Sequence, residues 1–510
     1  MNQRINVSTN KRKYMGQTTD FMVAIELGST RITGIAGQRD TDGKLSILAY
    51  ASEDASTCIR KGTVFNIDRT AGAITSIINK LESTLEASIA KVYVGISGQS
   101  VRTVKDTVIR QFEEETRITT TIVDELIASS RSTLMDGYEI LEVVPQEYKV
   151  GSGLQADPVG VITSHIEGRF LHIIARQGVR RKIEESFQLA KTRIAGYFIA
   201  PLEMAKITAT DTELRSGCAI IDFGAETTTV QVYKDHLLRH LVVLPLGSNN
   251  ITKDICSQGI EEADAEELKI KYASAYTEPY EIDSKPVTYT YGADSSTISD
   301  RVLNEITEAR MEEIITNVWH QIGLSGYDDK LMAGIIVTGG GSHLGQLQTA
   351  LQKKTHIEKY RHATYIIPPV ESVTPELLAK NSRQGTLLGL LYSARQNCCE
   401  QELPRDLFAT DIDETEAARQ AQQEEIERQK AEAARIAQEE EAARAAEAQR
   451  IAQEKAEQEA AIRREEEERL EAERKAKAEE ERRIKRENSL FGRLQKWGKK
   501  LAEDIVNGDD

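Results

Sequence analysis

The sequence lacks several features that define whole classes of protein. No apolar run reaches about 18 residues, the length that a membrane-spanning helix needs. The five cysteines show no CxxC or Cys/His spacing, which argues against a zinc site and fits a reducing cytoplasm. The net charge of -16 argues against a general nucleic-acid binder. What remains is a chain of 510 residues, long enough for more than one domain.

The first twenty residues also lack a targeting signal. Met1 to Asp20 is polar and basic, without the apolar core that a signal peptide carries. We expect residues 1–20 to form a disordered leader, and Met15 and Met22 remain alternative starts of the chain.

The stretch from Phe21 to about Tyr392 has the pattern of a globular α/β protein. Short apolar strands alternate with longer helical patterns, and glycine- or hydroxyl-bearing turns end the strands. Two such strands lie in the first third and two lie beyond residue 215, which predicts two similar halves. Between 101 and 178 the pattern becomes a strand, a helix and two further strands, which predicts a small inserted domain.

The stretch from Asp411 to Glu487 contains no glycine, proline or aromatic residue. It is dominated by glutamate, alanine, arginine, lysine and glutamine, which are strong helix formers. Glutamate repeatedly precedes a basic residue by four positions, as at Glu440 and Arg444, and such pairs stabilise an isolated helix. Because the isoleucines hold no heptad spacing, we expect residues 398–487 to form a charged helical linker; disorder and a weak coiled coil remain alternatives.

An amphipathic basic pattern occupies residues 488–506. At about 100° per residue, apolar side chains share one face and basic side chains lie on or beside the opposite face. The apolar set is Leu490, Phe491, Leu494, Trp497 and Leu501, and the basic set is Arg493, Lys496, Lys499 and Lys500. The pattern favours a helix at the boundary between lipid headgroups and acyl chains. Docking on its own domain or in a partner's groove remains the alternative.

Three glycine-bearing turns follow apolar strands. Backbone N–H groups and hydroxyls in such turns can bind phosphate oxygens, and bare glycine lets a ligand approach the backbone. Glu26 and Asp222, at the ends of the first two strands, are suited to hold Mg²⁺ through water. A helix is expected to begin near Leu344, after the third turn. The turns contain, in order, Gly28, Ser29 and Thr30; Gly224 and Thr227; and Gly339, Gly340 and Gly341.

The order and spacing of these turns resemble the actin/Hsp70/sugar-kinase superfamily. Within that superfamily, the chain most resembles the FtsA family of bacterial cell-division proteins. The features that carry this resemblance are the insert, the terminal helix and the stretches 92–98, 265–269, 308–314 and 385–389. The resemblance implies an α/β, actin-like two-lobed fold of duplicated ribonuclease-H-like domains with a small α+β insert domain. The implied boundaries are 21–100 and 179–215 for lobe 1, 101–178 for the insert, 216–254 and 331–397 for the core of lobe 2, 255–330 for its outer subdomain, 398–487 for the linker and 488–506 for the amphipathic helix.

The resemblance also implies that the three turns bind ATP with Mg²⁺. Two phosphate turns would hold the phosphates, and the triple-glycine turn would lie against the adenosine. Glu266 and Lys269 match a helix that reaches the ribose and the adenine. From the residues alone, a surface ion pair between Glu266 and Lys269 is an equal alternative.

Two departures from the superfamily pattern limit the activity that we expect. Ala225 and Glu226 replace two glycines of the second turn, and a carboxylate beside phosphates would repel them unless it faces away or meets the metal. No glutamine or histidine clearly positions a hydrolytic water, so Glu203 and Asp222 are the candidate bases. We expect ATP binding and at most a weak ATPase.

The resemblance implies several partners. The insert would mediate head-to-tail self-assembly, and residues 255–330 would bind the C-terminal peptide of FtsZ through Arg310, for which a pair with Glu313 is the alternative. The terminal helix would bind the anionic cytoplasmic side of the inner membrane at the septum, beside other division proteins. The implied function is an ATP-binding protein that polymerises on the membrane and tethers the FtsZ ring. A sugar-type kinase and an actin-like scaffold of another envelope machine are the alternatives.

Overall fold

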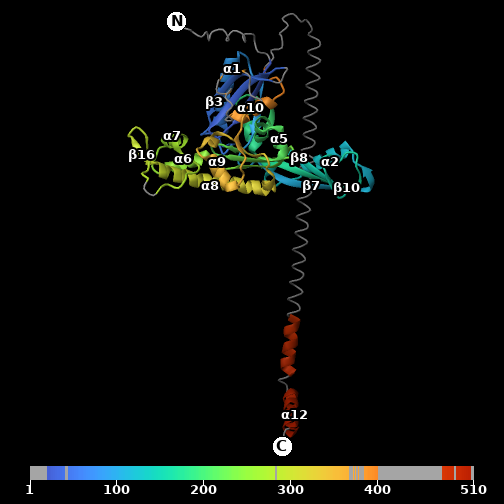
Figure 1. Cartoon of the computed structure of the whole chain (residues 1–510). Helices are drawn as coiled ribbons and strands as arrows, with labels where there is room; N and C mark the ends of the chain where they lie inside the picture. Colours follow the sequence, from blue (N-terminus) through green and yellow to red (C-terminus); the bar gives the residue numbers. More distant parts are fainter. Residues whose placement is uncertain are drawn as a thin grey trace, which may run out of the picture. The chain divides into compact units, whose positions relative to one another are not determined.

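The computed structural model divides the chain into two units, Met1–Glu402 and Leu403–Asp510 (Figure 1). The described strands all lie in the first unit, and the second contains the terminal helix α12 (Leu490–Val506). Most of the predicted leader, and residues 400–473 of the predicted linker, lie outside the described residues. The structure describes residues 20–40, 44–281, 284–366, 371–372, 374, 377, 384–399, 474–486 and 490–506.

Lobe 1 is built on a mixed sheet with the strand order β11-β6-β1-β2-β3-β19. Strands β1, β2 and β3 form an antiparallel meander, and β6 and β11 continue from β1 in parallel. The strands are β1 (Met22–Leu27), β2 (Arg31–Arg39), β3 (Leu45–Asp54), β6 (Lys91–Ile96), β11 (Arg193–Ile199) and β19 (Glu371–Ser372).

Lobe 2 repeats this topology. Strands β12, β13 and β14 form a second antiparallel meander, and β17 and β18 continue from β12 in parallel. The predicted duplication of a ribonuclease-H-like sheet is therefore confirmed. The strands are β12 (Cys218–Phe223), β13 (Thr228–Lys234), β14 (Leu237–Leu244), β17 (Gly334–Thr338) and β18 (Tyr360–His362).

Helices cover both faces of the lobe 1 sheet. A side chain at Gly34 would overlap Ile77 of α1 (Ile67–Leu85), and a side chain at Gly37 would overlap Leu391 of α10 (Gly385–Ser393). Positions three apart on a strand face opposite sides of its sheet. Helices α1 and α10 therefore lie on opposite faces, and their closeness depends on these two glycines.

The inserted domain follows the predicted order of strand, helix, strand and strand. Its core contains Ile122, Leu126, Ile166 and Phe170. The pairing of Arg102 with Val242 of β14 joins the insert to the sheet of lobe 2, which the sequence did not predict. The elements are β7 (Arg102–Arg117), α2 (Thr120–Arg131), β8 (Tyr138–Val150), β9 (Gly153–Gln155) and β10 (Ile162–Arg176).

Helices and one short hairpin complete lobe 2. The longest of the described helices, α8, packs on β13 and β14 and on the shorter helices α6 and α9 (Figure 1). The predicted start of a helix near Leu344 is wrong in detail. The third glycine turn forms a 3₁₀ helix, and α9 begins at Leu347. The elements are α6 (Ser248–Cys256), α7 (Glu262–Tyr272), β15 (Thr288–Tyr291), β16 (Ser296–Ser299), α8 (Asp300–Ser325), η2 (Gly340–His343) and α9 (Leu347–Thr355).

Shorter elements complete the two lobes. Helix α4 packs on α10, and α3 packs on α1. The remaining elements are β4 (Ile59–Arg60), β5 (Thr63–Val64), α3 (Val179–Leu189), α4 (Ala200–Thr208), α5 (Asp211–Ser216) and η1 (Asp328–Lys330).

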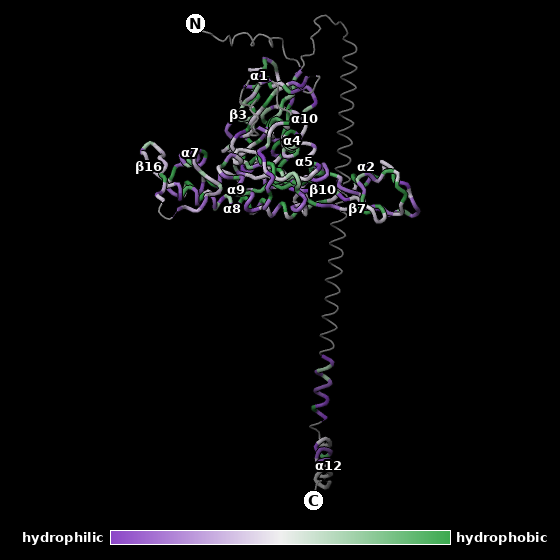
Figure 2. Tube along the Cα trace, viewed as in Figure 1, coloured by the Kyte–Doolittle hydropathy of each residue, from purple (hydrophilic) through white to green (hydrophobic). Residues whose placement is uncertain are grey.

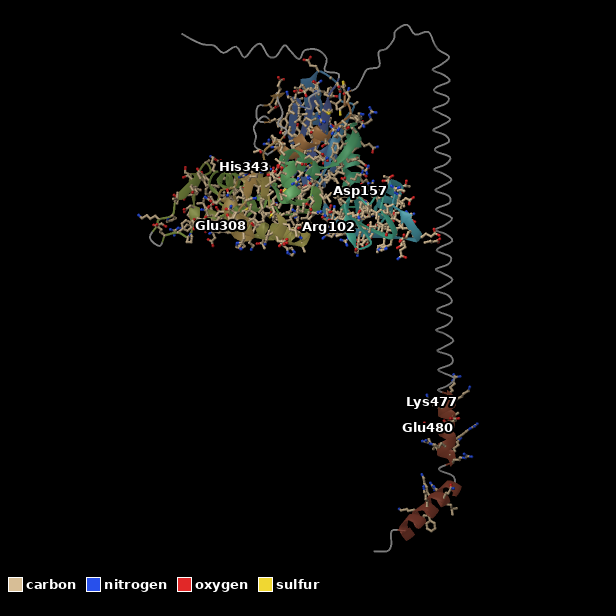
Figure 3. The ribbon with its side chains drawn as sticks, turned by 45° about the vertical axis from the view of Figure 1, so that its right-hand side comes forward. Arg102, Asp157, Glu308, His343, Lys477 and Glu480 are labelled. Atoms are coloured by element: carbon tan, nitrogen blue, oxygen red, sulfur yellow. The ribbon has the colours of Figure 1, made fainter. Side chains whose placement is uncertain are left out.

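The second unit is polar where it is described. Residues 474–486 are helical and exposed, as predicted for this part of the linker, and Figure 2 colours them mainly hydrophilic. Lys477 and Glu480 project from this stretch (Figure 3), and Glu480 pairs with Arg483 at 3.6 Å. Within the described residues, no helix combines the length and the apolar character that crossing a bilayer requires.

The contact between α4 and α10 allows a test of close packing. A methyl group at Gly389 would overlap the backbone of Glu203 and Met204 in α4, whereas one at Gly72 in α1 would meet nothing within 4 Å. We expect Gly389→Ala to lower the free energy of unfolding by about 1–3 kcal/mol through overpacking. Gly72→Ala should raise it by up to about 1 kcal/mol through helix propensity. Urea unfolding of both variants measures the difference, and equal effects would contradict the packing.

Candidate functional site

Two carboxylates occupy equivalent positions in the two lobes. Glu26 is the fifth residue of β1 and pairs with Thr33 of β2, and Asp222 is the fifth residue of β12 and pairs with Thr229 of β13. Burial, and then the charge of Asp222, raise the pKa of Glu26 to about 7. Burial raises the pKa of Asp222 to about 6. The duplication therefore brings two partly buried acids within electrostatic reach of each other.

This acid pair fits a magnesium ion. Mg²⁺ is usually held by one or two carboxylates, together with water and substrate phosphates. A cation beside the pair would favour the charged form of both acids and offset their repulsion. Among the described residues, no group of three or more potential metal-ligating side chains occurs. Glu26 and Asp222 can therefore supply only part of a coordination shell, and the remaining ligands would be water and phosphate oxygens.

The second and third glycine turns lie against each other. Gly339 has a φ of +84°, and a Cβ there would overlap the carboxylate of Asp222, so glycine is required on both grounds. A Cβ at Gly341 would lie 3.1 Å from the carbonyl oxygen of Phe223 and 3.3 Å from Ser248. Gly340 has open space around its missing Cβ. The triple-glycine turn is thus packed on the second turn by two of its three glycines.

The first turn is tied to a neighbouring loop of lobe 1. Ser29 Oγ accepts a hydrogen bond from the backbone N–H of Gly62 at 2.9 Å. Gly28 packs beside the carbonyl oxygen of Arg31, where a Cβ would lie 2.7 Å away. Thr30 accepts a hydrogen bond from the backbone of Ala55 through its carbonyl oxygen. The loop around Gly62 was not among the residues that the sequence singled out.

Glu226 of the second turn crosses to lobe 1. Its carboxylate accepts a hydrogen bond from the backbone N–H of Lys61 at 2.6 Å, next to the N–H that Ser29 binds. The structure therefore explains how a glutamate can replace a glycine in this turn: the Glu226 carboxylate points toward a backbone donor of the other lobe. Gly224 and Thr227 close the same turn through a hydrogen bond of 2.9 Å from Gly224 N–H to the Thr227 carbonyl oxygen.

Helix α6 begins directly on the second turn. The backbone N–H groups of Ser248 and Asn249 donate to the carbonyl oxygens of Gly224 and Ala225 at 3.0 and 2.7 Å. Because the first N–H groups of a helix have no partner within the helix, these bonds fix the turn against the helix. The second turn is thus held from both lobes.

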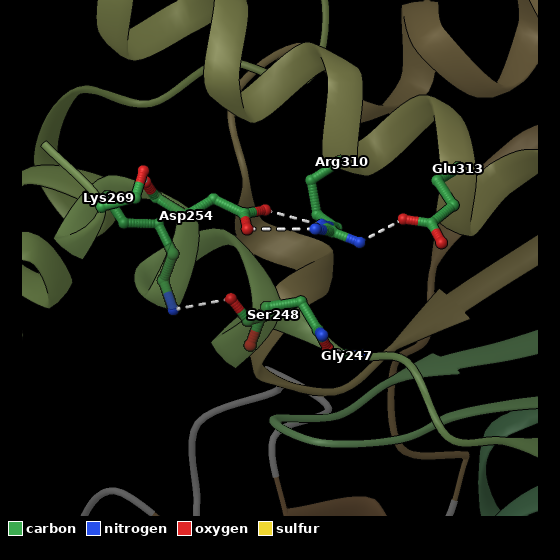
Figure 4. Close-up of polar contacts among 8 residues, drawn as sticks. Gly247, Ser248, Asp254, Lys269, Arg310 and Glu313 are labelled. Carbon is green, nitrogen blue, oxygen red and sulfur yellow. Dashed lines mark hydrogen bonds and ion pairs between the residues drawn. The ribbon is translucent and has the colours of Figure 1, made fainter.

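Glu266 and Lys269 form an ion pair at 2.7 Å, and Lys269 is only 6% exposed. The lysine Nζ also donates to Thr252 at 2.9 Å and to the Ser248 carbonyl oxygen at 3.3 Å. Figure 4 shows the contact with Ser248. The ion pair between Glu266 and Lys269, which was the alternative to a role in ligand binding, is present. Lys269 is buried, however, and contacts Ser248 of α6, the helix that borders the triple-glycine turn.

The other predicted residues have different surroundings. The two oxygens of Glu203 accept hydrogen bonds from Lys206 at 2.9 and 2.8 Å, and Ser393 donates to the same carboxylate. Of the two candidate bases, Asp222 is therefore the one beside the glycine turns. Arg310 makes a bidentate pair with Asp254 of α6, at 2.6 and 3.0 Å, and also binds Glu313 (Figure 4). The sequence missed the contact with Asp254.

The terminal helix α12 covers the predicted amphipathic pattern. Leu494 and Trp497 are 66% and 68% exposed, which leaves large apolar side chains in contact with solvent. Arg493, Lys496, Lys499 and Lys500 are exposed as well. The side chains of Leu490, Phe491 and Leu501 lie outside the described residues.

The duplicated sheets and the paired acids define the class of this protein: it has an actin-like fold with an inserted domain. Two family models match parts of this chain. The model "Cell division protein FtsA" matches residues 219–381, and "SHS2 domain inserted in FTSA" matches residues 98–175, which cover the insert from β7 almost to the end of β10.

Curated relatives identify the family. FtsA of Porphyromonas gingivalis is 30% identical over 394 residues, covering 76% of this chain and 81% of the relative. FtsA of Neisseria meningitidis is 25% identical, and FtsA of Escherichia coli K12 is 24% identical; each match covers 74% of this chain and 91% of the relative. The chain belongs to the FtsA family of cell division proteins.

Solved structures with related folds are more distant. The PilM–PilN type IV pilus biogenesis complex aligns with a TM-score of 0.49 and 14% identity, covering 74% of this chain and 98% of that chain. MreB5 of Spiroplasma citri bound to ADP aligns with a TM-score of 0.40 and 12% identity, covering 69% and 94%.

The raised pKa values of the acid pair predict a pH-dependent stability. Because the folded protein holds these protons more tightly than the unfolded chain, the stability that they contribute is lost as the pH rises from about 4.5 to 7. Glu26→Gln should remove this loss and stabilise the protein at pH 8, on the order of 3 kcal/mol, but not at pH 4.5.

Urea unfolding at the two pH values measures this effect. Glu305→Gln, on an exposed position of α8, is the matched control and should follow the wild type at both pH values. A Glu26→Gln variant that shows the wild-type pH dependence would contradict the assignment.

Proposed function

We propose that this chain is an ATP-binding cell division protein that polymerises on the cytoplasmic membrane and tethers the FtsZ ring. The observation that carries the nucleotide part is the meeting of Glu26 and Asp222, from equivalent strands of the two lobes, beside three glycine turns. Membership of the FtsA family supports the role in division.

In this proposal, each glycine turn binds a different part of ATP. N–H groups and hydroxyls at Gly28, Ser29 and Thr30 would hold phosphates from lobe 1, and Gly224 and Thr227 would hold them from lobe 2. Mg²⁺, bound through water to Glu26 and Asp222, would neutralise phosphate charge. The adenosine would lie against Gly339, Gly340 and Gly341, with Glu266 and Lys269 nearby.

The proposed partners use other surfaces. The insert, whose sheet continues that of lobe 2, would form the contact between successive copies in a filament. The outer part of lobe 2, residues 255–330, would bind the C-terminal peptide of FtsZ. Arg310 would contribute there only by sharing or exchanging its present partners Asp254 and Glu313. Other division proteins would join this assembly at the septum.

The terminal helix supplies the proposed membrane contact. Its exposed Leu494 and Trp497 would enter the acyl boundary, and its basic residues would meet anionic headgroups on the cytoplasmic side. This arrangement makes the protein a peripheral one, with the charged linker as a spacer between the membrane and the actin-like body.

The position of Glu226 predicts a change in nucleotide binding. Removing the carboxylate with Glu226→Gly should raise the affinity for ATP about tenfold, because one negative charge beside the phosphates is lost. The affinity for ADP should rise less, because ADP carries less charge. Isothermal titration with each nucleotide and Mg²⁺ measures both effects.

Glu226→Gln separates charge from hydrogen bonding. It should raise the affinity for ATP similarly, yet still accept the bond from Lys61 and keep the amide of that residue protected from hydrogen exchange. Glu226→Gly should expose the same amide to exchange. If ATP binds neither the wild type nor the variants, the nucleotide site itself is refuted.

The exposed apolar face of α12 predicts lipid binding that depends on Trp497. Trp497→Glu should lower binding of the full chain to anionic vesicles at least tenfold, because the burial of a large apolar side chain is replaced by that of a charge. High salt should weaken wild-type binding only partly, since it screens the lysines and spares the apolar contact. Co-sedimentation with vesicles measures both.

Gln495→Glu is the matched control, because it adds the same charge away from the apolar face. The control should retain most of the binding. With the wild type and the control, the C-terminal peptide of FtsZ should enter the vesicle pellet, and with Trp497→Glu it should not. Equal loss in both variants would show that net charge alone governs binding.

A further inference from the structure

A cavity of about 430 Å³ lies at the opposite end of β1 and β2 from the Gly28 turn. Its lining includes Met22 at the start of β1, Arg39 at the end of β2, and Arg395 just after α10. The volume falls in the range of small-molecule sites in proteins. Because β1 separates it from Glu26, this cavity is distinct from the proposed nucleotide site.

One edge of the Arg39 guanidinium, formed by Nε and Nη2, has no hydrogen-bond acceptor among the described residues. Its Nε and Nη2 atoms are buried and make no hydrogen bond with the described protein. These two nitrogens lie on the same edge of the planar group, and this edge binds two oxygens of a carboxylate or a phosphate in parallel. The ring of Tyr392 lies 4.5 Å from the guanidinium carbon and holds its plane.

The charge of Arg395 disfavours the charged form of Arg39. Burial, and then the charge of Arg395, lower the pKa of the Arg39 guanidinium. Asp40 also lines the cavity, but its carboxylate accepts a hydrogen bond from the backbone N–H of Lys44 at 2.7 Å. Asp20 lines the cavity too, yet neither it nor Asp40 accepts a hydrogen bond from Nε or Nη2 of Arg39, so these two buried donors cost free energy unless an anion pairs with them.

We propose that this cavity binds an oxyanion, a carboxylate or a phosphate, held side-on by the Nε and Nη2 atoms of Arg39 and contacted by Arg395. The paired oxygens would satisfy both buried nitrogens at once, and the negative charge would offset the repulsion between the arginines. The anion is a free ion or a small metabolite that carries such a group.

Titration of the full chain with inorganic phosphate, at constant ionic strength and without nucleotide, tests the proposal. Phosphorus NMR line broadening gives the affinity. We expect saturable binding that Arg395→Gln weakens about tenfold and that Arg39→Gln abolishes. Arg69→Gln is the matched control, because it removes an exposed charge from α1 of the same lobe and should leave the affinity unchanged.

The proposal is overturned if the wild type shows no saturable binding, or if Arg69→Gln weakens binding as much as Arg395→Gln does. Circular dichroism of each variant verifies that loss of binding is not loss of folding.

Discussion

Two acids that repel each other are held side by side by the strands that carry them. Glu26 and Asp222 stand at the same position of β1 and β12, strands that are otherwise almost fully buried. Neither acid can move away without disturbing the centre of its sheet. Burial raises the pKa of both groups, and the charge of Asp222 raises the pKa of Glu26 further, so the cost of holding these charges is part of the fold. A site that destabilises its own charged form is suited to a cation, and the glycine turns beside it are suited to the anion that would accompany one.

The same duplication explains how the two lobes are held together near this pair. Glu226 binds the backbone of Lys61, and the adjacent Gly62 donates to Ser29, so one short loop of lobe 1 contacts both the first and the second glycine turn. Elsewhere the insert, which lies between segments of lobe 1 in the sequence, joins the sheet of lobe 2 through β7 and β14. Movement of one lobe relative to the other would therefore change contacts both at the glycine turns and at the junction between the insert and lobe 2. In the proposed function, this is the physical route by which nucleotide would influence the contacts between copies.

The sequence predicted the parts of this site that local patterns specify. Apolar strands ending in glycine turns identified Gly28, Gly224 and Gly339, and the period of the apolar residues identified α12. Contacts between distant residues carry no local signal: Glu226 and Lys61 are 165 positions apart, and Arg310 and Asp254 are 56 apart. The burial of Lys269 and the partners of Glu203 depend on packing in the same way. The pocket at Arg39 was also missed, because an arginine at the end of a strand reads as an ordinary exposed residue until Tyr392 and Arg395 are placed beside it.

In the proposed function, the membrane contact of the terminal helix depends on assembly of the actin-like body. A single short helix with a modest apolar face binds a membrane weakly and reversibly. Copies joined in a filament would present many such helices to one surface, and each attachment would raise the effective concentration of the next. Lipid binding would then report on assembly, and assembly would in turn depend on the nucleotide between the lobes. The long charged linker is compatible with this coupling because its sequence from Asp411 to Glu487 contains no aromatic residue and is dominated by charged and polar residues and alanine.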